Sequence, residues 1–476
     1  MDSISLTDIL IADYLQRKGF IETFKCFETD LNHTLTSVRD STIKYEKLED
    51  IITDRVKYLN MPHEEIIEKG LNSLNLSKNS SSLKLKKWSY PCVDTNKDIT
   101  DLIGEVLVIH LSAETMELPD GNGPKQVLFV TTNDKKLSVI DLEQFKVLYC
   151  FDNVNKHSIG KCCYGIPNTD TFLSCGMDGV LRYFKIDGSN AVELTNRQLH
   201  KRLITDFQYF ELEGEGYVVS IGWDSFIKLH KLSFTADRTP QIVPVAQFKL
   251  LSNATALQLA FYNDEPIFIV TRLDSTQLAY FTALQDTNGN QLTLHELIKV
   301  SLNDAEFSTH GFTPMSITVN SAQLNDSEPG LVAVSTSHVP YLRVIITKTP
   351  SFKDLFSKLT STDTMDSSSN EQQLSTPTIR GHILQNYTTT SPQDKFSQSK
   401  VLWRLDQSGI WIMGDDGVIR GMECQNGQIV EKLINYEDNE DDTNGSRRIK
   451  NMIVTNVNGK EIVVSSGIDK KLNYWS

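Results

Sequence analysis

The sequence predicts an all-β domain built from repeated four-stranded sheets, preceded by a small all-α region. One pattern recurs along the last four-fifths of the 476 residues: a small residue, Gly, any residue, Asp, any two residues, and then an apolar, a basic and an apolar residue. Its copies are mostly separated by roughly 45 to 55 residues, the length of a four-stranded repeat. Residues 6–31 instead show apolar spacing typical of two short helices.

The clearest copy of the pattern is residues 174–184, Ser-Cys-Gly-Met-Asp-Gly-Val-Leu-Arg-Tyr-Phe. It predicts a strand, a tight turn and a second strand. Glycine adopts positive φ without steric cost, and an aspartate side chain accepts hydrogen bonds from N–H groups of its own turn. We interpret the turn aspartates as structural rather than catalytic, because each belongs to a different repeat. They are Asp134, Asp178, Asp224, Asp274, Asp416 and Asp469.

These repeats resemble the WD-repeat β-propeller family, with Phe184 and Trp475 in the place of the family's signature tryptophan. The other copies carry different residues there. The resemblance implies an all-β, seven-bladed propeller over residues 83–476. We expect residues 83–90 to supply the outer strand of the last blade, which would close the ring and remove an open sheet edge. The expected blades are residues 104–152, 157–199, 200–250, 254–302, 311–390, 394–436 and 449–475.

The fifth repeat departs from the pattern. Its expected strands, 331–334 and 341–345, flank a turn that has no aspartate. A Ser- and Thr-rich insert at 355–378 follows, with too few apolar residues to pack, and we expect it to be disordered. The acidic loop 437–446 is expected to lie in solvent.

Residues 6–31 predict two helices separated by Gly19. So short a pair buries too little apolar surface to offset the entropy of ordering it, so we expect it to have a packing partner. The stretch resembles the LisH motif, which implies homodimerisation through residues 1–35. The alternative is that the helices fold back on the propeller. The residues that match the motif are Ile11, Tyr14, Leu15, Gly19, Phe20, Phe24, Phe27 and Glu28.

Between these two parts, residues 36–76 predict a helical extension or short coiled coil, because Leu48, Ile52, Val56 and Leu59 form one apolar stripe. Residues 77–82, Ser-Lys-Asn-Ser-Ser-Ser, predict a flexible linker.

Composition and motifs exclude several classes of function. A net charge of -14 disfavours general nucleic-acid binding, and no apolar run reaches the roughly 20 residues that span a bilayer. Seven cysteines without C-x-x-C spacing indicate reduced thiols in the cytosol or nucleus. No phosphate-binding loop, nucleophile elbow or H-E-x-x-H motif occurs. We therefore expect no enzyme activity, metal or cofactor, and we expect His157 and His200 to bond to the repeat turns.

Binding of protein partners is the remaining expectation. In the WD-repeat family the residue before the turn aspartate lies on the binding face, which here is Trp223, with Met177, Asp415 and Ile468 in equivalent places. Large aromatic residues and arginines are enriched at binding hot spots. An acidic or phosphorylated peptide is therefore a candidate ligand. The alternative is that Trp223 packs on a neighbouring blade and that the basic residues only aid solubility. These basic residues are Lys201, Arg202, Arg447 and Arg448.

A LisH motif followed by a WD-repeat propeller implies a non-enzymatic, self-associating scaffold in a cytosolic or nuclear complex. Dimerisation would present two propellers to a partner and increase avidity. Two alternatives stay open: a substrate-recruiting subunit of a ubiquitin ligase, and a regulator of dynein or of transcriptional corepression.

Overall fold

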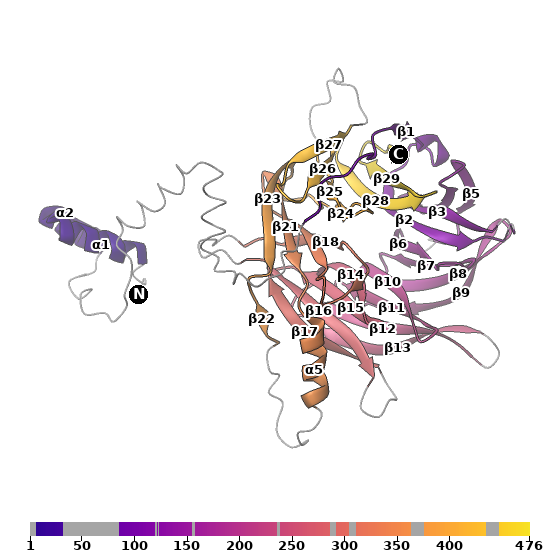
Figure 1. Cartoon of the computed structure of the whole chain (residues 1–476), viewed down its shortest axis with the longest axis horizontal. Helices are drawn as coiled ribbons and strands as arrows, with labels where there is room; N and C mark the ends of the chain where they lie inside the picture. The colour runs from indigo at the N-terminus through magenta and orange to yellow at the C-terminus, as the bar shows by residue number, and fades with distance from the viewer. Residues whose placement is uncertain are drawn as a thin grey trace. The chain divides into compact units, whose positions relative to one another are not determined.

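The computed structural model divides the chain into two compact units, Met1–Ser82 and Leu83–Ser476. The predicted helical extension, the linker and the acidic loop all lie outside the described residues. Strands make up most of the second unit (Figure 1). The structure describes residues 6–31, 85–119, 121, 123–154, 158–235, 239–285, 292–303, 311–362, 376–434 and 447–476.

The first unit contains two helices, α1 (Leu6–Lys18) and α2 (Ile21–Asp30). Gly19 lies between them with φ +77°, a conformation that glycine adopts at no steric cost and that ends the first helix. Ala12 and Phe24 are the buried centre of the pair, with Leu15, Phe27 and Leu31 packed around them.

The strands of the second unit pair into seven sheets. The first contains β2 (Val108–Glu117), β3 (Pro124–Thr132), β4 (Leu137–Asp141) and β5 (Lys146–Phe151). The second contains β6 (Gly160–Gly165), β7 (Thr171–Gly176), β8 (Val180–Asp187) and β9 (Asn190–Gln198). The third contains β10 (Ile204–Leu212), β11 (Glu215–Gly222), β12 (Phe226–Phe234) and β13 (Pro240–Lys249).

The fourth sheet contains β14 (Ala254–Tyr262), β15 (Glu265–Arg272), β16 (Gln277–Gln285) and β17 (Leu292–Ser301). The fifth contains β18 (Pro314–Val319), β20 (Leu331–Thr336), β21 (Tyr341–Lys348) and β23 (Ile383–Pro392). The sixth contains β24 (Val401–Trp403), β25 (Gly409–Ile412), β26 (Ile419–Glu423) and β27 (Ile429–Leu433). The seventh contains β28 (Ile449–Val457), β29 (Lys460–Gly467), β30 (Leu472–Trp475) and β1 (Asn96–Asp98).

The seven sheets form a closed ring. The first strand of each sheet contacts the first strand of the next, in the order β2, β6, β10, β14, β18, β24 and β28, and β28 contacts β2 again. One apolar cluster fills the space between each pair of neighbouring sheets, including the seventh and the first. The first strands therefore line the centre of the ring, and the face-to-face packing of the sheets supplies its core.

The ring is closed by β1, which pairs antiparallel with β30. The prediction that residues 83–90 would supply this strand was wrong. The described part of that segment, residues 85–90, is not a strand; its Trp88 instead packs edge-on against Trp411, with ring centroids 5.2 Å apart. Trp88 occupies this place because Gly409 and Gly421 lack the Cβ atoms that would collide with its ring.

Two extra strands and a helix join the fourth and fifth sheets. β19 (Gln323–Leu324) lies in the connection between β18 and β20, and β22 (Thr378–Ile379) lies in the connection between β21 and β23. They pair in parallel with β14 and β17 of the fourth sheet, respectively. α5 (Phe352–Thr362) lies in the insert between β21 and β23.

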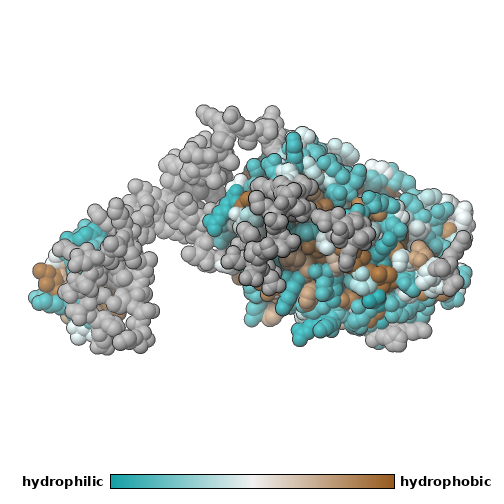
Figure 2. Space-filling model, turned by 90° about the horizontal axis from the view of Figure 1, so that it is seen from below, coloured by the Kyte–Doolittle hydropathy of each residue, from teal (hydrophilic) through white to brown (hydrophobic). Residues whose placement is uncertain are grey.

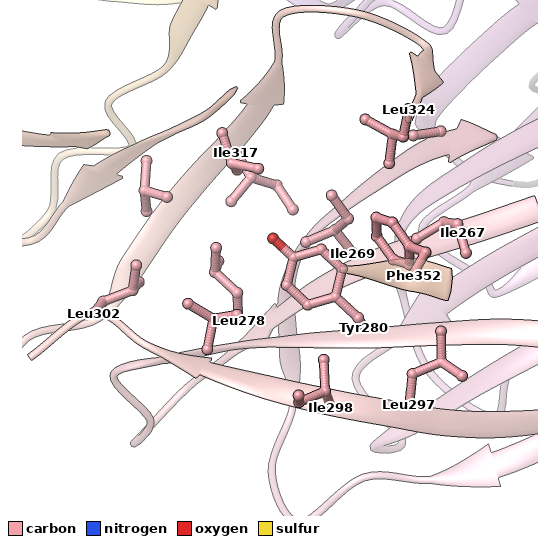
Figure 3. Packing of buried hydrophobic residues seen from close by; sticks show 14 of the residues in the cluster. Ile267, Ile269, Leu278, Tyr280, Leu297, Ile298, Leu302, Ile317, Leu324 and Phe352 are labelled. Carbon is pink, nitrogen blue, oxygen red and sulfur yellow. The ribbon is translucent and has the colours of Figure 1, made fainter. Parts of the chain in front are cut away.

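The expected disorder of the insert was therefore wrong for residues 355–362, which are helical, while 363–375 lie outside the described residues. The reason is apolar packing. Phe352 is fully buried in the cluster between the two sheets, beside Tyr280 and Ile269 (Figure 3). Phe356 stacks on Tyr262 with ring centroids 5.8 Å apart.

One carboxylate fixes the start of α5. Asp326 accepts hydrogen bonds from the N–H groups of Phe352 and Lys353, at 2.8 and 3.0 Å, and from the Tyr262 hydroxyl at 2.6 Å. Partial burial raises the pKa of Asp326, but these hydrogen bonds outweigh it, so the pKa lies below its usual value.

The surface drawn in Figure 2 is largely hydrophilic over the second unit, with apolar residues in small separate areas. Among the described residues, no helix combines the length and apolar character needed to cross a membrane.

We predict that Asp326→Ala lowers the free energy of unfolding by about 1 to 3 kcal/mol, because it leaves the first N–H groups of α5 and the Tyr262 hydroxyl without an acceptor. Chemical denaturation should measure this loss at pH 7. Since the folded-state pKa of Asp326 is depressed, the gap between wild type and variant should narrow as the pH falls below about 4. Glu328→Ala, an exposed change in the same loop, is the matched control; an equal loss in both variants contradicts the capping role.

Candidate functional site

One face of the ring carries the turns between the second and third strands of each sheet, together with the connections that lead into the next first strand. We call it the turn face. In all seven sheets the N–H of a turn residue donates to the carbonyl of the residue that precedes the first strand, as Trp223 does to Leu203 at 2.9 Å. Turn and connection are thus held side by side around the ring. The donors are Asn133, Met177, Trp223, Leu273, Ser337, Met413 and Ile468.

The turn aspartates bind their own turns. The side chains of Asp178, Asp416 and Asp469 accept from the N–H two residues further on, at 3.1, 3.3 and 3.1 Å. The residue after the aspartate has positive φ, +77° at Gly179 and +62° at Lys470. Asp274 differs, because it carries the positive φ itself, at +57°.

Four of the turn aspartates have a glycine two residues earlier, and this glycine has another role than the one predicted. Gly176, Gly222, Gly414 and Gly467 are not among the residues with positive φ. A Cβ atom at Gly414 or Gly467 would lie within 2.5 Å of the turn aspartate's carboxylate, and one at Gly222 would lie 2.6 Å from the His200 ring. The glycine is therefore required for close approach of side chains and not for its φ.

The basic residue of the repeat pattern pairs with the turn aspartate. Arg182 lies 2.6 Å from Asp178, and Lys228 lies 3.6 Å from Asp224. Arg420 donates to Asp416 at 3.0 Å. Burial raises the pKa of Asp178, but hydrogen bonds from Arg182 and the Val180 N–H more than offset it. These carboxylates therefore stabilise the turns of the fold through hydrogen bonds and ion pairs.

Sheet three contains a chain of three side chains that has the connectivity of a hydrolytic triad. His200 Nδ1 lies 2.7 Å from Asp224 Oδ1, and His200 Nε2 lies 2.9 Å from Ser220 Oγ. Ser220 and His200 are both fully buried, so no substrate reaches the hydroxyl. His200 thus bonds to the repeat turn as predicted, whereas His157 lies outside the described residues.

The exposed large apolar side chains gather on the turn face. Half of those in the described residues belong to its turns and connections, and Tyr341 lies next to one of these turns at the start of β21. Trp223 is half exposed, and the exposed Lys201 and Arg202 occupy the adjoining connection, where the Lys201 N–H donates to Asp224 at 3.1 Å. Trp223 is therefore not covered by a neighbouring sheet. The exposed apolar residues of this face are Met177, Trp223, Leu251, Leu273, Val339, Tyr341, Phe396, Ile434 and Ile468.

The second predicted basic pair is placed differently. Arg448 forms ion pairs with Asp394 at 2.8 Å and with Asp415 at 3.2 Å, and only 17% of its side chain is exposed. Arg447 is half-buried and lies beside Asp469 and Gly417 in a shallow depression. The structure places Lys201, Arg202 and Trp223 next to one another. Arg448, by contrast, forms its ion pairs with carboxylates of the ring itself.

A polar cluster lies at the turn-face end of the ring's centre, and sequence reasoning missed it. Tyr164 donates to Asp206 at 3.1 Å and packs edge-on against His110, with ring centroids 5.2 Å apart. Burial, and then the charges of Lys400 and Lys161, lower the pKa of His110 to about 3. Burial raises the pKa of Asp206 to about 6, despite the opposing effect of Lys400. Its members lie on or beside the first strands of four different sheets, so no local motif marks the cluster.

The remaining predicted residues are placed as follows. In the helical unit Phe24 is buried, Ile11, Tyr14, Leu15 and Phe27 are half-buried, and Phe20 is 51% exposed. All seven cysteines are free thiols. Within the described ranges, no group of three or more His, Cys, Asp or Glu side chains has the arrangement of a metal site.

We predict that Asp224→Ala costs about 1 to 3 kcal/mol of folding free energy, because the buried His200 ring and the Lys201 N–H lose their acceptor. Denaturant unfolding followed by tryptophan fluorescence should show the loss. Asp187→Ala, an exposed change at the other end of a neighbouring sheet, should leave the midpoint unchanged. Equal midpoints for Asp224→Ala and wild type would refute the structural assignment.

Comparisons with known proteins agree with this architecture. An uncharacterized protein of Saccharomyces cerevisiae, YGR117C, is 25% identical over 459 residues, which is 88% of each chain. Residues 67–476 match a protein family described as "UCP007778, beta-propeller domain". Because this match covers well over half of the sequence, the chain belongs to that β-propeller family.

Proposed function

We propose that this protein is a non-enzymatic, dimeric scaffold that binds protein partners through the turn face of its propeller. In this proposal the seven sheets are the blades of a WD-repeat type propeller, and the helical unit is a LisH-type dimerisation motif. The protein works in the cytosol or nucleus, and no catalytic step is required of it.

The observation that carries the proposal is the concentration of exposed apolar residues on the turn face. A half-exposed tryptophan flanked by two exposed basic side chains has the composition of a protein-binding hot spot. The nearby carboxylates of Asp178 and Asp224 are already paired with Arg182, His200 and Lys228. The positive charges of Lys201 and Arg202 are exposed beside Trp223. They favour an acidic or phosphorylated peptide as the partner.

The helical unit supports self-association. Of the side chains described in its two short helices, only Ala12 and Phe24 are buried, while Phe20 and Ile21 are 51% and 63% exposed. Apolar residues are visible on its surface in Figure 2. A second copy of the same pair would cover them and add the apolar burial that one copy lacks.

We predict that Trp223→Ala combined with Arg202→Glu reduces recovery of specific partners by at least about tenfold, since loss of a hot-spot tryptophan typically costs about 2 kcal/mol or more. Affinity purification with quantitative mass spectrometry measures the recovery. Phe234→Ala is the matched control, because Phe234 is an aromatic residue that is 65% exposed, against 50% for Trp223, at the opposite end of the same sheet. Undiminished recovery with the turn-face variant refutes the assigned surface.

We predict that the full chain, with a monomer mass of 53.8 kDa, elutes with twice that mass. Phe20→Glu with Ile21→Glu should convert it to monomer, because two charges would be buried in the shared interface. Light scattering coupled to size-exclusion chromatography gives the mass. Glu22→Ala, an exposed change on the same helix, should remain dimeric; a monomeric wild type would contradict dimerisation.

A further inference from the structure

A series of bulges lies at the turn-face end of the strands that line the centre of the ring. The pairing register shifts near the start of six of the seven first strands, for example between Gly160 and Cys162 and between Ile204 and Asp206. Such bulges re-aim side chains and are over-represented near functional sites. Lys161 is the extra residue in the second sheet.

Four sheets contribute to the polar cluster at this end. His110 comes from the first sheet, Lys161 and Tyr164 from the second, Asp206 from the third, and Lys400 directly precedes the first strand of the sixth. Lys161 and Lys400 are close enough to act electrostatically on each other and on His110. Residues from opposite sides of the ring therefore converge on one place.

The cluster has unsatisfied positive charge. No ion pair or hydrogen bond joins the ammonium group of Lys161 or Lys400 to any described residue, and Asp206, whose carboxylate acts electrostatically on Lys400, is hydrogen-bonded to Tyr164. His110 Nε2 is buried without a hydrogen-bond partner among the described residues. Two converging ammonium groups deep in a protein repel each other and are costly to desolvate, so they are stable when an anion lies between them.

We propose that Lys161, Lys400 and His110 form a binding site for a small phosphate-bearing anion at the centre of the ring. A phosphate group presents several acceptor oxygens and a charge near -2, which suits two lysines that act as point charges and a histidine ring that can donate. The hydrogen-bonded Tyr164–Asp206 pair lies beside this site, where Tyr164 packs against the His110 ring. The site is separate from Trp223 and does not depend on the scaffold function.

Isothermal titration of the full chain with inorganic pyrophosphate and with ATP, at constant ionic strength, tests the proposal. We expect saturable binding by at least one of the two probes and at least tenfold weaker binding after Lys161→Met or Lys400→Met. Lys460→Met, which replaces the exposed first residue of β29 at the opposite end of the seventh sheet, should bind like wild type. Absence of binding by wild type, or equal weakening in all three variants, overturns the site.

Unfolding of the same variants without ligand gives an independent readout. Removing an unpaired ammonium should leave the ligand-free protein as stable as wild type or more stable, and it should abolish the rise in unfolding temperature that pyrophosphate or ATP causes. A lysine variant that is markedly less stable without ligand would assign the cluster a structural role and overturn the proposal.

Discussion

The pairing of β1 with β30 is the contact on which the ring depends. Asn96–Asp98 lie alongside Asn473–Trp475, and the ends are fastened by further hydrogen bonds, from Leu472 N–H to Thr100 Oγ1 and between Ser476 and Thr95. Without β1 the seventh sheet would expose the backbone of β30 as an open edge. Because each apolar cluster is shared by two neighbouring sheets, every sheet depends on the ring being complete.

Much of the fold could be predicted from the sequence because the repeat turns are local structures. The turn aspartate, the basic residue four positions later and the glycine two positions earlier all act within one hairpin, so their spacing survives in the sequence. The reason for the glycine could not be predicted, since it depends on a carboxylate or on His200 approaching in space. Trp88 was misassigned for a similar reason: its partners, Gly409 and Gly421, lie more than three hundred residues away. The helix in the insert was hidden by its Ser- and Thr-rich surroundings, although Phe352, Leu355 and Phe356 have helical spacing.

The candidate site shows the same division. Trp223, Lys201 and Arg202 belong to one repeat, so the sequence placed them together correctly. Arg448 was expected to be a free anchor, but Asp394 and Asp415 reach it from the preceding repeat and its connection. The cluster of His110, Lys161, Asp206 and Lys400 is drawn from four repeats, and no single stretch of the chain reveals it. Contacts between charged residues of different repeats are therefore the part of the site that can be found only from the three-dimensional structure.

The closing sheet has a consequence for synthesis of the protein on the ribosome. Among the described strands, β1 is synthesised first and its partner β30 last. β1 therefore has no pairing partner until the six intervening sheets have been synthesised. Long-range pairing of this kind is slow and leaves intermediates open to aggregation. A nonsense mutation before β30 would therefore leave a polypeptide that cannot complete its ring, and cellular quality control should recognise it as a misfolded product.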